Sequence, residues 1–190
     1  LRNLGAKVAY YIPNRIGEGY GVSASAIERI AGDRFSLIIT VDTGITANEE
    51  IALANQLGVD VVVTDHHECH GDLPQASAVV NPCRSDCSYP FADLAGVGVV
   101  FKLVCAIEER LYKDKKSKLD CVRDICREYA DLVALGTIAD VMPLRDENRL
   151  IVGYGLKLME NTSRRGLAAL IDASTQRGDV RAVSGELPKP

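Results

Sequence analysis

The chain has 190 residues, of which 47% are hydrophobic and 25% are charged, and its formal net charge is −4. These values exclude collagen-like, low-complexity and disordered chains, and they argue against a protein that grips nucleic acid by bulk charge alone. No apolar run approaches the roughly 18 residues of a membrane span, and the first residues lack the apolar stretch of a signal peptide. We therefore expect a globular cytoplasmic protein with a sizeable apolar core.

Strand-like and helix-like segments alternate over residues 6–65. Apolar runs rich in strand formers predict three strands, at residues 6–12, 36–41 and 59–64. Capping-box spacings predict a helix after each of the first two strands, one led by Ser25 with Glu28 and one by Thr46 with Glu49. The third run is so rich in Val that it indicates burial on both faces, as in a parallel sheet. The resulting βαβαβ unit predicts an α/β fold, with a parallel β-sheet flanked by helices.

The rest of the chain is predicted to be mostly helical. Residues 66–93 read as a loop with one short strand at 78–80, and a loop of this length in a compact domain is usually functional. Helical patterns follow at 94–112, 119–139, 149–159 and 166–173. We expect one domain over residues 1–173 and a linker or truncated end over 174–190. The basic run at 110–118 is typical of a solvated linker between helices, with contact to a nucleic-acid backbone as the alternative.

Three of the six cysteines, Cys69, Cys83 and Cys87, lie near His70 in the long loop, which raises a zinc hypothesis. Three residues separate Cys83 from Cys87, so the CxxC spacing of strong zinc motifs is missing. The other three cysteines fall in apolar helical stretches, where a cysteine is usually a small core residue. The sequence leaves a structural zinc site open but does not favour it.

Polar residues follow each of the three predicted strands. Asn14 and Arg15 come after the first strand, residues 42–44 (Asp-Thr-Gly) after the second, and residues 65–67 (Asp-His-His) after the third. Neighbouring parallel strands end about 4.8 Å apart, at the edge where ligands bind in open α/β sheets, so Asp42 and residues 65–67 can share a metal ion. A carboxylate with imidazoles suits Mn²⁺, Zn²⁺ or Fe²⁺ better than Mg²⁺. The alternatives are an ordinary helix-entry turn at Asp42 and two surface histidines.

A further candidate, Asp140, stands at the end of a predicted helix. The run at 132–138 is apolar on every side, so we expect this helix to be buried. An acidic residue at a buried helix C-terminus is destabilised by the helix dipole and by burial, so a cation should lie nearby. The sequence leaves two candidates open for that cation, a metal ion and the side chain of Arg149.

Five motifs resemble the DHH phosphoesterase family, and within it they are most similar to RecJ-like exonucleases. The motifs occupy residues 11–15 with 18–21, 41–44, 64–67, 94–103, and 134–144 with 147–149. Their order in the chain makes the resemblance specific, since an isolated Asp-His-His would be weak. The resemblance covers about residues 6–172.

The resemblance implies a role for each matching residue. Asp42, His66 and Asp140 would be metal ligands, with Asp42 bridging two divalent ions. The catalytic pair would be His67, which faces the scissile phosphate, and Asp65, which orients an imidazole. Contacts to substrate phosphates are implied for Arg15, Asn14, Gly96, Gly98 and Arg149.

The implied activity is hydrolysis of phosphodiester bonds by two divalent ions, Mn²⁺ or Mg²⁺, with nucleotides removed in the 5′ to 3′ direction from single-stranded DNA in repair and recombination. Expected partners are single-stranded DNA, a single-strand-binding protein and a helicase. No association with a membrane is expected. Two alternatives are a DHH-family phosphatase of short oligonucleotides or nucleotides, and a non-catalytic scaffold.

The sequence also departs from the family pattern. The family's upstream Asp-x-Asp motif is absent before Asp42, its downstream domain is absent too, and residue 1 is Leu. We therefore expect a fragment of the catalytic core, inactive or nearly so alone.

Overall fold

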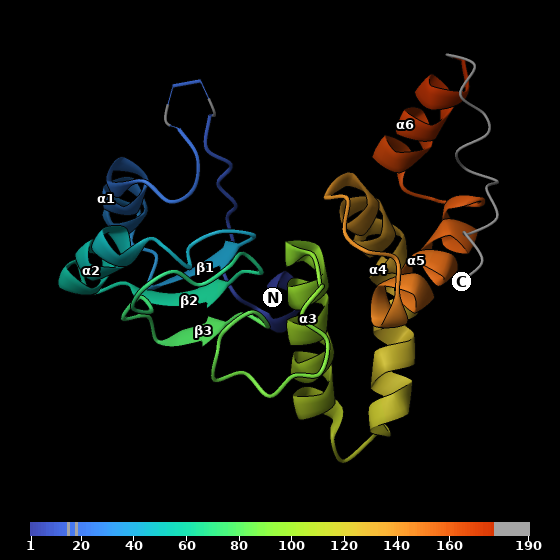
Figure 1. The fold of residues 1–190 in the computed structure, drawn as a ribbon, viewed down its shortest axis with the longest axis horizontal. Helices are drawn as coiled ribbons and strands as arrows, with labels where there is room; N and C mark the ends of the chain where they lie inside the picture. The colour runs from blue at the N-terminus through green and yellow to red at the C-terminus, as the bar shows by residue number, and fades with distance from the viewer. Residues whose placement is uncertain (15, 18, 177–190) are drawn as a thin grey trace. The chain divides into compact units, whose positions relative to one another are not determined.

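The computed structural model of the chain describes residues 1–14, 16, 17 and 19–176 (Figure 1). The chain divides into two compact units, Leu1–Val80 (unit 1) and Asn81–Pro190 (unit 2). Unit 1 carries the sheet, and unit 2 is built from helices. Each unit has apolar clusters of its own.

Three parallel strands form the sheet of unit 1, in the order β1-β2-β3. They are β1 (Leu37–Val41), β2 (Asp60–Thr64) and β3 (Ala78–Val80), and a 3₁₀ turn, η1 (Arg2–Leu4), precedes them. Val41 pairs with Thr64 and Thr64 with Val80, so all three strands end level with one another. The predicted parallel sheet and the short strand at 78–80 are confirmed.

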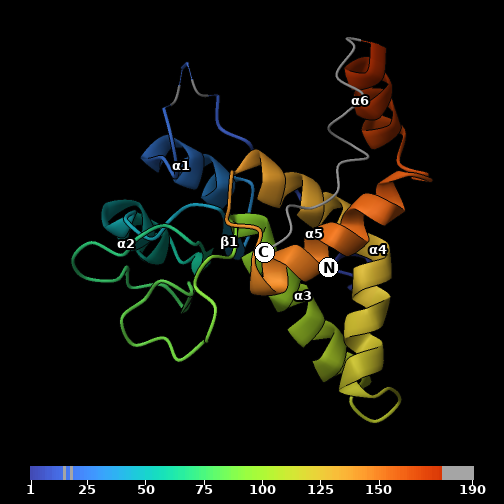
Figure 2. The same cartoon turned by 45° about the vertical axis from the view of Figure 1, so that its right-hand side comes forward.

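Helices α1 (Ala24–Gly32) and α2 (Asn48–Gln56) cover the face of the sheet that carries Val61 and Val63 (Figures 1 and 2). Ile27 of α1 and Ile51 of α2 pack with both valines in one buried cluster. Full burial of an aliphatic side chain of this size contributes about 1.5–3 kcal/mol, so this cluster stabilises unit 1. The α/β fold predicted from the sequence is therefore confirmed.

The predicted strand at residues 6–12 is wrong. This segment pairs with no strand in the part of the chain that the structure describes, and the side chains of Tyr10 and Ile12 are 84% and 78% exposed. A strand is stable only when neighbouring backbone satisfies its N–H and C=O groups, whatever its side-chain pattern. The segment is held by side chains instead, with the Arg29 guanidinium 4.4 Å from the Tyr11 ring centre.

The predicted helix caps are also wrong, although both helices exist. Ser23, not Ser25, caps α1, since its hydroxyl accepts the N–H of Ala26 at 3.3 Å. Helix α2 has no side-chain cap at Thr46, because the chain is still turning there and the N–H of Ala47 bonds to a turn carbonyl. The different helix starts do not change which side chains face the sheet, since Ile27 and Ile51 lie in the buried cluster.

Four helices build unit 2, and they agree with the predicted helical segments. They are α3 (Gly96–Tyr112), α4 (Lys118–Ala139), α5 (Asp146–Met159) and α6 (Arg165–Gln176). Helices α3 and α4 pack through residues such as Phe101 and Val133, and α4 and α5 lie side by side in both views (Figures 1 and 2). Helix α6 reaches Gln176, inside the predicted linker 174–190, and the rest of that prediction lies outside the described residues. No helix in the described part of the chain is long and apolar enough to cross a lipid bilayer.

The basic run at 110–118 forms ion pairs with acidic residues of its own unit. Lys116 Nζ lies 2.8 Å from Asp124 Oδ2 and 3.1 Å from Glu108 Oε1, and Lys118 Nζ lies 3.4 Å from a Glu109 carboxylate oxygen. Hydrogen bonds to Asp124 and Glu108 raise the pKa of Lys116. Internal pairing of these lysines favours the linker interpretation over contact with nucleic acid.

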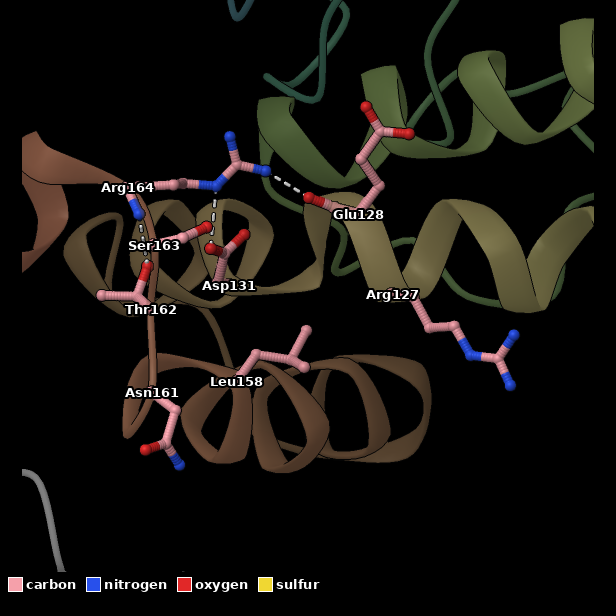
Figure 3. Close-up of a pocket in the computed structure, with 8 residues that line it drawn as sticks. All are labelled: Arg127, Glu128, Asp131, Leu158, Asn161, Thr162, Ser163 and Arg164. Atoms are coloured by element: carbon pink, nitrogen blue, oxygen red, sulfur yellow. Dashed lines mark hydrogen bonds and ion pairs between the residues drawn. The ribbon is translucent and has the colours of Figure 1, made fainter.

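A polar cavity of about 400 Å³ lies in unit 2 between α4, the end of α5 and the loop before α6 (Figure 3). Arg164 Nε donates to Asp131 Oδ2 at 2.8 Å, and the same guanidinium also donates to the carbonyl of Glu128. The Asp131 side chain is only 8% exposed, and Arg127 points away from these groups (Figure 3). Arg164 therefore fastens the loop before α6 to α4.

We expect Arg164→Ala to lower the free energy of unfolding by about 2 kcal/mol, because it leaves the buried Asp131 carboxylate without its charged partner. Arg127→Ala is a matched control in the same cavity. Its side chain is 62% exposed and its ion pair with Asp124 spans 3.5 Å, so we expect a change of about 0.5 kcal/mol or less. Urea denaturation followed by circular dichroism measures both. Equal losses in the two variants would contradict the role given to Arg164.

Candidate metal centre

Asp42 lies directly after β1, at the start of the turn that leads to α2. Its backbone has φ +62°, a left-handed conformation that costs a non-glycine residue about 1–2 kcal/mol. Its N–H donates to the Thr64 carbonyl at 3.0 Å, which extends the β1–β2 pairing by one residue. Gly44 follows with φ +109°, and a Cβ there would lie 2.8 Å from Thr40 Oγ1, so the turn requires glycine. This turn presents the Asp42 carboxylate at the carboxyl end of the sheet.

The Asp65 carboxylate, 1% exposed, is the buried anchor of the next turn. It accepts hydrogen bonds from Ile45 N at 2.9 Å, His66 N at 2.8 Å, His67 N at 3.3 Å and His67 Nδ1 at 2.7 Å. Burial raises the pKa of Asp65, but the hydrogen bonds from the His67 ring and from the three backbone N–H groups outweigh it, so the pKa lies below its usual value. The ionised carboxylate joins the turn after β1 to His67. A His67 ring that donates from Nδ1 leaves Nε2 as an acceptor or a metal ligand.

His66 faces Asp42. Its Nε2 lies 2.9 Å from Asp42 Oδ1, and its side chain is 9% exposed. The rings of His66 and His67 have centres 4.6 Å apart. One potential ligand atom from each of Asp42, His66 and His67 lies within 4.8 Å of the others. Within the described residues, this is the one such group of at least three histidine, cysteine or acidic side chains, so Cys69, Cys83 and Cys87 form no zinc cluster there.

The donor set at this edge fits a divalent transition metal. One carboxylate and two imidazoles match the ligand preferences of Mn²⁺, Zn²⁺ and Fe²⁺. The three side chains converge from two neighbouring parallel strands, the arrangement that the sequence predicted for Asp42 and residues 65–67. The family resemblance implied a role for His67 at the scissile phosphate, and the structure brings its ring among the potential metal ligands.

Asp140, the further predicted ligand, belongs to unit 2, where it ends α4. The prediction that this helix end is buried on every side is wrong, since Leu132 is 37% exposed, Ile138 is 44% exposed and Asp140 is itself exposed. Within unit 2, helices α3 and α5 pack against only part of the surface of α4. Burial therefore gives no reason to expect a cation at Asp140, and its role as a ligand stays a prediction.

The predicted phosphate contacts lie in both units. Asn14 is exposed, and its Oδ1 accepts the N–H groups of Ile16 at 3.0 Å and Gly17 at 3.4 Å, so it shapes its own loop. Arg15 lies outside the described residues. Gly96 and Gly98 are buried in the first turn of α3, and Arg149 is half-buried on α5. Their contacts with substrate stay predictions.

Sequence reasoning missed a polar network around Glu147 in unit 2. The Tyr89 hydroxyl donates to Glu147 Oε1 at 2.6 Å, and Lys102 Nζ forms an ion pair with Glu147 Oε2. Beside it, Asn148 Nδ2 donates to the Asp93 carbonyl at 2.6 Å. The network joins the loop before α3 to the start of α5. Glu147 belongs to a motif quoted above, but no local pattern could reveal a partner 58 residues away.

We expect the stabilising effect of Glu147 to depend on pH. Burial raises the pKa of Glu147, but hydrogen bonds with Lys102 and Tyr89 outweigh it and hold the pKa below its ordinary value of 4.5. A depressed pKa adds stability above the ordinary pKa, and that stability is lost as the pH falls through the folded-state pKa. Glu147→Gln should therefore cost about 1–2 kcal/mol at neutral pH, and the cost should shrink as the pH falls below 4.5. Urea denaturation of both proteins at several pH values tests this, and a cost independent of pH would contradict it.

The fold and the site define an α/β domain with a candidate metal centre at the carboxyl ends of its parallel strands. The family model described as the N-terminal domain of the DHH family matches residues 1–137. The chain therefore belongs to the DHH family.

The relatives within this family are exonucleases. The chain is 46% identical over 186 residues to the single-stranded-DNA-specific exonuclease RecJ of Bacillus subtilis, a match that covers 98% of the chain and 22% of that protein. It is 37% identical over 190 residues to RecJ of Escherichia coli, covering 97% of the chain and 32% of that protein. A crystal structure of exonuclease RecJ bound to manganese matches with a TM-score of 0.78 and 37% identity, over 96% of this chain and 44% of that one. The chain thus spans about a fifth to a third of the length of these curated relatives.

Proposed function

We propose that the protein is a metal-dependent phosphodiesterase that removes nucleotides from the 5′ end of single-stranded DNA. One observation carries the proposal. Potential ligand atoms of Asp42, His66 and His67 converge within 4.8 Å at the sheet edge, in a chain 37–46% identical to single-stranded-DNA exonucleases over nearly its whole length. No feature of the structure favours the phosphatase or the scaffold alternative.

Each residue of the site has a proposed task. Asp42, His66 and His67 would hold a divalent ion, Mn²⁺ or Mg²⁺, and Asp140 would serve a second one. A bound ion supplies positive charge that lowers the pKa of a coordinated water and stabilises charge on the phosphate oxygens. Asp65 holds the His67 ring through Nδ1, which keeps Nε2 directed away from the buried carboxylate.

Binding of the DNA strand is proposed for five residues, namely Arg15, Asn14, Gly96, Gly98 and Arg149. A guanidinium fork matches two phosphate oxygens, so the arginines suit this task. Helix α3 has no side-chain cap, so the backbone N–H groups of its first turn can donate to a phosphate. A single-strand-binding protein and a helicase are proposed partners in repair and recombination.

The test measures nuclease activity of the full-length protein, because the chain spans only 22–33% of its curated relatives. Substrates are a long DNA single strand labelled at either end, its duplex, and a dinucleotide. With Mn²⁺ we expect rapid release of a 5′ label from the single strand and slow attack on the duplex, and EDTA should stop the reaction until Mn²⁺ is restored. Preferential hydrolysis of the dinucleotide would support the phosphatase instead, and hydrolysis of none of the three would support the scaffold.

A further inference from the structure

The unusual backbone of Asp42 must be held in place by its surroundings. A left-handed φ of +62° at a non-glycine residue is retained only where neighbouring contacts outweigh its cost. The Asp42 side chain is 51% exposed, so packing around the carboxylate contributes little beyond its contact with His66. The backbone of the turn and the strand beneath it supply further contacts.

Thr40 supplies such a contact. Its hydroxyl donates to the carbonyl of Thr43 at 2.7 Å, a bond that spans Val41 and Asp42 and closes the turn around them. Thr40 is 6% exposed, so water does not compete for this bond. A hydroxyl bonded to a carbonyl three residues later fixes the direction in which the chain leaves β1.

Thr40 is itself held on three sides. Its carbonyl accepts the hydroxyl of Thr64, and its backbone pairs with Val63 in the sheet. The α-carbon of Gly44 packs so closely on it that a Cβ there would lie 2.8 Å from the hydroxyl oxygen. The hydroxyl is therefore enclosed, with its position set by the sheet rather than by the exposed turn.

We propose that Thr40 is a positioning residue of the metal centre, which sets the place of the Asp42 carboxylate through the carbonyl of Thr43. This inference rests on the metal-dependent function proposed above. The Asp42 carboxylate lies 2.9 Å from His66 Nε2, while His66 is placed by β2 and the Asp65 turn. The Thr40 hydroxyl thus determines how well the ligand from β1 meets the ligands that follow β2.

The experiment measures Mn²⁺ binding to the full-length protein by calorimetry without DNA. Thr40→Val keeps the shape of the side chain and removes the hydroxyl, so we expect Mn²⁺ affinity to fall about 10–100-fold. Thr40→Ser restores the hydroxyl and should bring the affinity back to within about threefold of the unsubstituted protein. Ser77→Ala is the control, since it removes a hydroxyl of unit 1 that bonds to Asp60 Oδ1 at 3.0 Å and contacts neither Thr40 nor the turn after β1, and its affinity should change by about twofold or less.

Unchanged Mn²⁺ affinity in a folded Thr40→Val protein would overturn the inference, as would failure of Thr40→Ser to restore an affinity that Thr40→Val had lost. If circular dichroism shows that Thr40→Val does not fold, Thr40→Ala takes its place. Mn²⁺ affinity of Thr40→Ala equal to that of Thr40→Ser would then also overturn the inference. Absence of Mn²⁺ binding in the unsubstituted protein would instead overturn the proposed function, and the inference with it.

Discussion

Asp42→Asn in the full-length protein is expected to lower the rate of Mn²⁺-dependent hydrolysis of single-stranded DNA by about 10³-fold or more. Asp42 supplies the carboxylate of the three-residue cluster and lies 2.9 Å from His66 Nε2, so the substitution removes its negative charge from the centre. Asparagine keeps the size of the side chain and tolerates the left-handed φ of +62° at this position. The variant therefore tests the charge without disturbing the turn. Initial rates of nucleotide release at several Mn²⁺ concentrations measure the effect.

The control for Asp42→Asn is Glu68→Gln, which removes the carboxylate of the residue that follows His67 in the sequence. The Glu68 side chain is 85% exposed and its ion pair with His70 spans 3.6 Å, so its removal should leave activity within about twofold. Asp42→Ala should be as inactive as Asp42→Asn and also less stable, because alanine is less tolerant of the left-handed backbone. Full activity in both Asp42 variants would contradict the proposed role of Asp42 as a metal ligand.

The location of the candidate centre could be predicted because every step to it is local in the sequence. Alternation and a Val-rich run identify two strands, and the helix between them requires the strands to be parallel. The register then pairs Val41 with Thr64, so the residues after them meet at one edge. What the strand pattern could not reveal is the geometry of the turns, including the positive φ of Asp42 and the bond from Thr40 that spans it.

The errors in strand pairing and burial come from features that depend on distant residues. Residues 6–12 have the pattern of a strand, but a strand also needs a partner, and the described residues supply none. Exposure of Leu132 and Ile138 depends on which faces of α4 are covered by other helices, and an apolar run carries no information about that. Glu147 meets Tyr89 across 58 residues of chain. Local pattern therefore predicted the helices, the three strands of the sheet and the meeting of the candidate ligands at one edge, while long-range contacts decided burial and pairing.

Gly155→Ala is expected to be the most destabilising small substitution in unit 2, because α5 crosses α4 at this residue with no room for a methyl group. A Cβ on Gly155 would lie 2.2 Å from the Ala130 carbonyl oxygen and 2.5 Å from Ala134 Cβ. Neither atom belongs to a flexible side chain, so the two helices would have to separate. Separation would open the contact between Ala134 and Val152, both of which are 0% exposed. Overpacking of this kind costs about 3 kcal/mol, which exceeds the gain of about 1 kcal/mol in helix propensity from glycine to alanine.

The expected net loss for Gly155→Ala is therefore about 2 kcal/mol or more, a fall of about 4–8 °C in Tm for a chain of this size. Gly166→Ala is the matched control, because it makes the same substitution in the first turn of α6, where nothing lies within 4 Å of the added Cβ. With only the propensity gain at work, Gly166→Ala should be neutral or stabilising by up to about 1 kcal/mol. Urea denaturation with unchanged m-values compares the two variants. Because both gain the same propensity, the difference between them isolates the cost of forcing α4 and α5 apart, and equal stabilities would show that the helices do not need glycine at their crossing.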